Sequence, residues 1–228
     1  MSLTSIPIIA AMPSGSTPAR SPAIAHRVAV VARGKRLEYL TIAWNSFEAV
    51  VALISGLIAG SVALVGFGID SVIETTSALI LLWRLRSDSQ AERRERSEQL
   101  ARRLIGVCFL MLAAYITAES SYALWTREHA ERSIAGIFIA VAAVAVMPLL
   151  ARAKRRVAVA LGSRALHSDS HQADFCAYLS AILLAGLLLN ALLGWWWADP
   201  IAALIMAPII AREGLQGLRG EACDDCGH

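Results

Sequence analysis

Long uninterrupted apolar runs constrain the fold of this chain more than any other feature of its sequence. Several runs approach or exceed the roughly 18–20 residues that cross a bilayer core of about 30 Å. Hydrophobic residues make up 57% of the 228 positions and the mean hydropathy is +0.56, which is more apolar than a soluble domain of this size. The sequence therefore predicts an all-α integral membrane protein with six transmembrane helices.

The apolar runs divide the chain into three parts. Residues 1–36 contain Pro, Ser, Gly and basic residues, and their apolar residues do not recur at a sustained regular spacing. We therefore expect a largely disordered tail with a short interfacial helix near 24–36. Residues 37–212 form the transmembrane domain, and residues 213–228 a short second tail. The expected spans are 39–59, 61–83, 104–124, 134–151, 169–193 and from 201 to about 211. Two longer connections join them, a charged segment over 84–103 and a basic loop over 152–164.

The distribution of Lys and Arg predicts the orientation of the chain in the membrane. Of the 21 basic residues, all but Arg127 and Arg132 fall in the two tails and in the second-to-third and fourth-to-fifth connections. Basic residues favour the cytoplasmic side, and only an even number of spans puts these segments together there. We expect both termini in the cytoplasm of a cell with a bacterial-type plasma (inner) membrane. The basic residues act as topology signals beside apolar runs, so no nucleic-acid partner is predicted.

Two carboxylates, Asp70 and Glu74, lie within the second apolar run. An ionisable group at membrane depth costs about 2.5–3.5 kcal/mol on insertion scales, so each of them needs an explanation. Their i, i+4 spacing places both on one face of a helix, one turn apart. Two adjacent anions in an apolar medium persist only when a cation or protons neutralise them, and a divalent ion accepts carboxylate oxygens. The alternative is a polar contact between helices.

Residues 60–74, the second span and its preceding turn, begin Gly-Ser-Val and end Asp-Ser-Val-Ile-Glu. With this motif the chain resembles the cation diffusion facilitator family of zinc and manganese efflux carriers, and the resemblance extends over about residues 37–212. It implies a cation-efflux-type bundle of six helices. It also implies that Asp70 and Glu74 supply half of a tetrahedral metal site, with Glu where the family usually has Asp.

The start of the fifth span departs from the His-x-x-x-Asp motif that the family carries there. The candidate ligands are Asp169, His171, Gln172 and Cys176. In register with the family motif, Asp169, Gln172 and Cys176 share one helix face, whereas His167, His171 and Asp174 share another. A cysteine thiolate binds zinc well and an amide binds it weakly, so neither face is a complete site. We expect the in-register face to meet the metal, because helix packing fixes its direction. The alternative is a polar cluster at the helix start, with Asp169 as a cap.

Other polar residues carry less specific signals. Asn45 and Glu48 in the first span, like Glu119 in the third, would line a water-filled path or form hydrogen bonds between helices. The last residues, 223–228, place two cysteines and a histidine at metal-like spacing in a segment too short to fold as a site.

We interpret the chain as a secondary carrier, not an enzyme, that exports a divalent metal cation in exchange for protons. Zinc is the first choice, as transported substrate and not as a prosthetic group. The other partners expected are protons and the lipid bilayer. The family's usual cytoplasmic α/β module has no counterpart in residues 213–228, so a homodimer would form through membrane helices. Two alternatives remain open: a membrane sensor or adaptor that keeps the fold without transport, and a proton-coupled exporter of organic cations.

Overall fold

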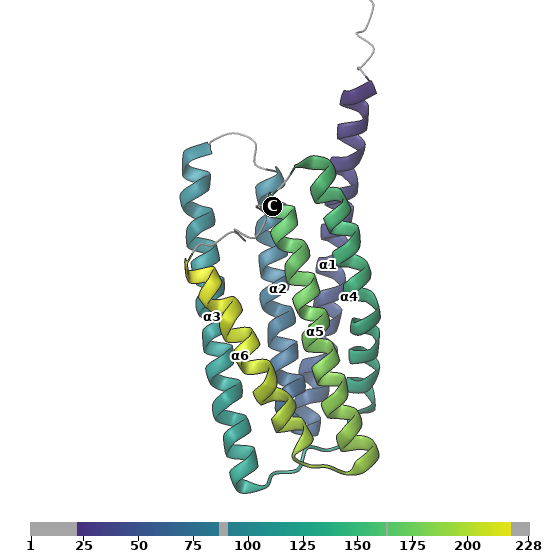
Figure 1. Ribbon diagram of the computed structural model, residues 1–228, viewed down its shortest axis with the longest axis vertical. Helices are drawn as coiled ribbons and strands as arrows, with labels where there is room; N and C mark the ends of the chain where they lie inside the picture. The colour runs from purple at the N-terminus through teal and green to yellow at the C-terminus, as the bar shows by residue number, and fades with distance from the viewer. Residues whose placement is uncertain (1–21, 87–90, 163, 220–228) are drawn as a thin grey trace, which may run out of the picture.

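Six long helices run side by side in the computed structural model, which describes residues 22–86, 91–162 and 164–219 (Figure 1). Each of them includes a stretch long and apolar enough to cross a membrane. The prediction of an all-α membrane bundle with six spans is confirmed. The helices are α1 (Pro22–Ala59), α2 (Val62–Arg86), α3 (Ala91–Thr126), α4 (Ile134–Leu161), α5 (Arg164–Leu193) and α6 (Ala198–Arg219).

Glycines with a positive φ make the tightest turns between the helices. Gly60 separates α1 from α2 with φ +63°, and Gly162 ends α4 with φ 60°. Glycine adopts this left-handed conformation without the steric penalty of a Cβ atom, so the chain reverses within a few residues. The α1–α2 hairpin thus turns between the first two expected spans, 39–59 and 61–83.

The helices extend well beyond the apolar runs from which they were predicted. α1 begins at Pro22, so the second half of the expected tail continues directly into the first span. α4 runs to Leu161, so most of the expected loop 152–164 is helix. α3 starts at Ala91, inside the charged segment expected over 84–103. Lys and Arg are good helix formers, and they mark where the apolar medium ends without ending the helix. Residues 1–21 and the Cys-x-x-Cys tail, 223–228, lie outside the described part.

The bundle divides into two packing groups. α1, α2, α4 and α5 pack mainly on one another, whereas α3 packs chiefly against α6. At the α3–α6 crossing, a Cβ atom added to Gly106 would lie 2.7 Å from the carbonyl oxygen of Gly214. Small residues of this kind allow two membrane helices to approach backbone to backbone. The four-helix group, which includes both α2 and α5, therefore holds the expected site.

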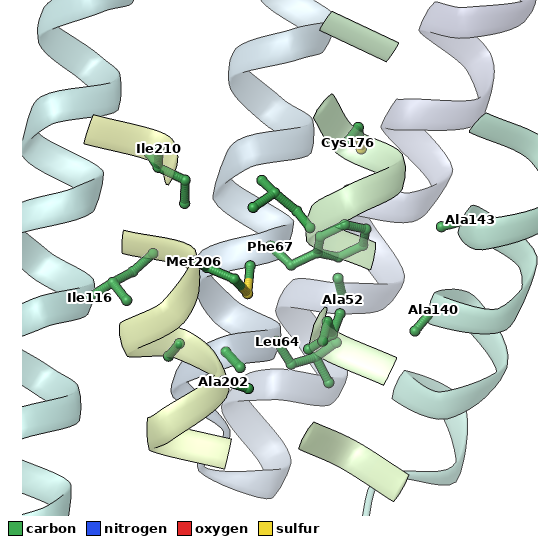
Figure 2. Packing of buried hydrophobic residues seen from close by; sticks show 14 of the residues in the cluster. Ala52, Leu64, Phe67, Ile116, Ala140, Ala143, Cys176, Ala202, Met206 and Ile210 are labelled. Carbon is green, nitrogen blue, oxygen red and sulfur yellow. The ribbon is translucent and has the colours of Figure 1, made fainter. Parts of the chain in front are cut away.

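The two ends of the bundle differ in character. We call one the basic end, where α1 begins and α4 ends, because Arg33, Lys35 and the segment 152–156 lie there. The other is the Gly60 end. On α2, Leu64 and Phe67 lie between Asp70 and the Gly60 end, and both are fully buried in the apolar core (Figure 2). Packed side chains therefore fill the bundle between the expected site and the Gly60 end.

Candidate metal centre

Asp70 and Glu74 on α2 meet Cys176 on α5 inside the four-helix group. One ligand atom from each residue lies within 4.8 Å of the other two, and all three side chains are buried. Tetrahedral ligands at about 2.0–2.3 Å from zinc are about 3.3–3.8 Å apart, so small side-chain movements would bring all three onto one ion. The arrangement is a candidate site for a borderline divalent cation.

The carboxylates of this centre have few hydrogen-bond donors around them. Within the described residues, neither oxygen of Asp70 nor Oε1 of Glu74 has a hydrogen-bond partner. Oε2 of Glu74 accepts one hydrogen bond, from Nδ2 of Asn45 on α1 at 2.8 Å. Buried carboxylates that lack donors are strongly unfavourable as bare anions, so these oxygens are suited to a cation or to protons.

A third carboxylate, Glu48 on α1, faces the same centre. Its side chain is completely buried, and neither of its oxygens forms a hydrogen bond in the part of the chain that the structure describes. It lies close enough to interact electrostatically with Asp70, Glu74 and Cys176. Glu48 is therefore a candidate for a fourth ligand, outside the group of three residues whose ligand atoms lie within 4.8 Å of one another.

The other candidates from the fifth span lie nearer the basic end. Asp169 forms an ion pair with Lys154 of α4, with Oδ2 and Nζ 2.5 Å apart. Oε1 of Gln172 accepts a hydrogen bond from Oγ of Ser77 on α2 at 3.4 Å. Neither residue belongs to the group formed by Asp70, Glu74 and Cys176. Among the three residues of the in-register face, Cys176 is the one that the structure places beside the two carboxylates of α2.

The alternative face of α5 points away from the centre. His171 is exposed and its ring packs against that of His167, with centroids 4.8 Å apart. Asp174 forms an ion pair with Arg155 on α4. These residues form contacts near the start of α5, which agrees with the polar-cluster interpretation of that face.

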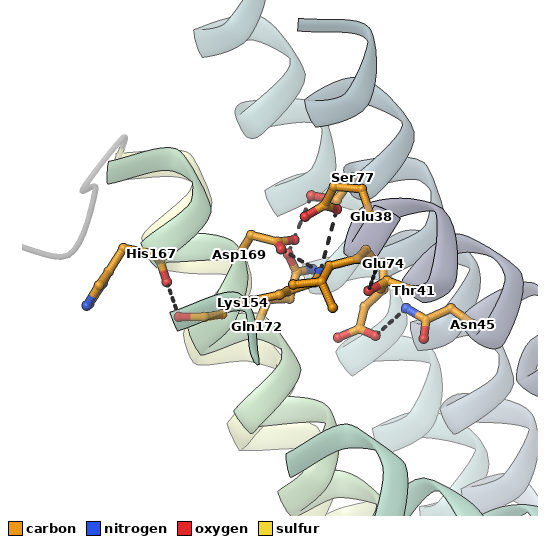
Figure 3. Close-up of polar contacts among 11 residues, drawn as sticks. Glu38, Thr41, Asn45, Glu74, Ser77, Lys154, His167, Asp169 and Gln172 are labelled. Carbon is orange, nitrogen blue, oxygen red and sulfur yellow. Dashed lines mark hydrogen bonds and ion pairs between the residues drawn. The ribbon is translucent and has the colours of Figure 1, made fainter. Parts of the chain in front are cut away.

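Sequence reasoning named Asn45 and Glu48 on α1, but it missed Glu38 and Lys154. Four polar residues of α1 are buried along one face, and they are Glu38, Thr41, Asn45 and Glu48. Their spacing of three or four residues is the helical period, so the pattern was visible in the sequence. Lys154 was assigned to a loop, yet its side chain is 1% exposed inside the bundle. Figure 3 shows Asp169 and Glu38 beside Lys154, and Asn45 beside Glu74.

This geometry defines a class of protein: a helical membrane bundle with a candidate cation-binding centre on α2 and α5. The cation efflux transmembrane domain model matches residues 39–220. The chain therefore belongs to the cation efflux family of membrane transporters, as the resemblance indicated. It is also similar to transmembrane protein 163 of Xenopus laevis, with 26% identity over 187 residues, which are 79% of this chain and 64% of the relative. The chain thus spans less than two thirds of that relative's length.

Proposed function

We propose that the protein exports a divalent cation, zinc first, in exchange for protons, and that Asp70, Glu74 and Cys176 bind the ion. The observation that carries this proposal is the convergence of the three ligand groups at one buried point on α2 and α5. Glu48 joins them as a fourth ligand when the ion is bound. The membership of the family supports cation transport, and the choice of ion rests on the ligand types.

The ligand set favours zinc over harder cations. Magnesium, calcium and manganese prefer shells made of oxygen, whereas a thiolate beside carboxylates suits zinc. A thiol in the site also favours a metal ion over an organic cation as the substrate. Thiol and carboxylate ligands must be deprotonated to bind a metal, so binding releases protons and reprotonation expels the ion. This chemistry supplies the exchange with protons once the centre opens alternately to the two sides.

X-ray absorption spectroscopy on zinc-loaded protein tests the proposed ligand set. The protein would carry Cys223→Ser and Cys226→Ser to remove tail thiols. We expect one sulfur at about 2.3 Å from zinc and oxygen ligands at about 2.0–2.2 Å. Replacing Cys176 by Ser should remove the sulfur. A spectrum without sulfur, or a sulfur that persists in the Cys176→Ser variant, would show that zinc binds elsewhere.

A further inference from the structure

A second polar cluster lies between the candidate metal centre and the basic end. It consists of Glu38 on α1, Lys154 on α4 and Asp169 on α5, and we call it the Lys154 cluster. Nζ of Lys154 lies 2.5 Å from Oδ2 of Asp169 and 3.6 Å from Oε2 of Glu38. The side chains of Lys154, Glu38 and Asp169 are 1%, 0% and 11% exposed. Three helices thus place three charged groups around one buried point.

The charges of the Lys154 cluster do not balance. Two carboxylates share a single ammonium group, and they are close enough to each other to interact electrostatically. Asp169 takes the short contact, and neither oxygen of Glu38 forms a hydrogen bond with a described residue. A buried carboxylate without donors is costly, and one ammonium cannot neutralise two of them. A divalent cation can, because its charge matches that of the pair.

The cluster also lies on the polar side of the metal centre. On α5, Asp169 precedes Cys176 by seven residues, or about 10 Å along the helix axis. Lys154 is near enough to Glu74 to interact with it electrostatically (Figure 3). Toward the Gly60 end, in contrast, Leu64 and Phe67 fill the interior. An ion that enters from the basic end therefore meets the cluster before it meets Asp70 and Glu74.

We propose that Glu38 and Asp169 form a second divalent-cation site, which the ammonium of Lys154 occupies as a tethered cation until an incoming ion displaces it. Two independent features support a ligand there: the unpaired, fully buried Oε1 of Glu38, and a cation already held between the carboxylates. Lys154 has a long flexible side chain, so it can leave without movement of a helix. The place of this second site on the ion's route rests on the proposed function, but the ability of Glu38 and Asp169 to bind a cation does not.

Counting bound zinc tests this site separately from the central one. The full-length protein, with Cys223→Ser and Cys226→Ser, would carry Asp70→Asn and Glu74→Gln to inactivate the central site. We expect weak zinc binding while Lys154 is present, because the ion must displace the ammonium, and tighter binding of one ion per chain after Lys154→Met, measured by titration calorimetry and by metal analysis. Adding Glu38→Gln should remove that ion again. No zinc in the Lys154→Met protein would overturn the proposal. Zinc that binds the protein with intact Lys154 and is still bound after Glu38→Gln is added would show instead that the central site had been assigned to the wrong residues.

A second variant keeps the test decisive if Lys154→Met does not fold. Glu38→Gln alone leaves Lys154 and Asp169 as an ion pair with balanced charges. A metal ion can then no longer easily displace the ammonium of Lys154. We expect zinc transport by this variant to fall about tenfold or more, while equilibrium zinc binding by the central site stays within about twofold of wild type. A purely structural role would lower the thermal stability and both functions together, and unchanged transport would contradict the proposal.

Discussion

At the scale of single residues, the centre depends on groups that only a partner can stabilise at membrane depth. Asp70 and Glu74 stand out in the sequence because an apolar run tolerates few carboxylates. Cys176 carries a weaker signal of its own, and it was a candidate ligand because it lies in register with the family's fifth-helix motif. The structure places it beside the two carboxylates.

Replacing Cys176 by Ser separates zinc from manganese. The loss of a thiolate weakens binding of the softer ion more, so we expect zinc affinity to fall by at least about tenfold and manganese affinity to change much less. His171→Ala is the matched control, because this exposed residue on the other face of α5 should leave both affinities near wild type. Titration calorimetry on the purified variants measures this. Loss of binding in His171→Ala with no effect of Cys176→Ser would mean that the other face lines the site.

At the scale of helices, Asp199 at the start of α6 secures the start of α2. Its carboxylate accepts hydrogen bonds from Oγ of Ser61 at 2.5 Å and from the backbone N–H of Val62 at 2.9 Å. The first N–H groups of a helix have no partner within the helix, so a buried helix start needs an acceptor of this kind. The contact joins α6 to the α1–α2 hairpin at the Gly60 end.

Removing this acceptor should destabilise the bundle. We expect Asp199→Ala to lower the free energy of unfolding by about 1–3 kcal/mol, because buried donors at the start of α2 lose their partner. Asp174→Ala removes a partly exposed ion pair with Arg155 and should cost less than about 1 kcal/mol. Thermal unfolding of the purified variants in detergent compares them. Equal stability of Asp199→Ala and wild type would contradict the capping role.

The sequence predicted the helices better than their contacts. Apolar runs locate the six spans because the bilayer demands a minimum apolar length. They place the helix ends poorly, since Lys154 and its basic neighbours continue α4 beyond the apolar run. All three residues of the candidate centre, Asp70, Glu74 and Cys176, were among the predicted ligands, whereas the predicted ligands Asp169, His171 and Gln172 lie outside that group. The partners of Asp169 and Glu48 depend on how four helices rotate against one another, and the spacing within a single helix does not determine that rotation.

At the scale of the whole molecule, the division into two helix groups and two unlike ends suits alternating access. Packed apolar side chains close the Gly60 end, and the Lys154 cluster lies toward the basic end. If both termini are cytoplasmic, as the Lys and Arg count predicts, the described conformation has its apolar barrier on the external side. Reporter fusions near residues 89 and 163 should then report cytoplasm, and a fusion at residue 129 the outside. The reverse pattern would invert the proposed direction of transport.

Zinc uptake into proteoliposomes driven by a pH gradient tests the central claim most directly. With an acidic lumen, protons leave as zinc enters, so wild-type protein should accumulate zinc and dissipation of the gradient should stop it. Asp70→Asn and Glu74→Gln should each reduce uptake to the level of empty vesicles, whereas Glu128→Gln, a change of an exposed carboxylate between α3 and α4, should transport normally. Uptake at the wild-type rate in either site variant, or uptake indifferent to the gradient, would contradict metal–proton exchange at this centre.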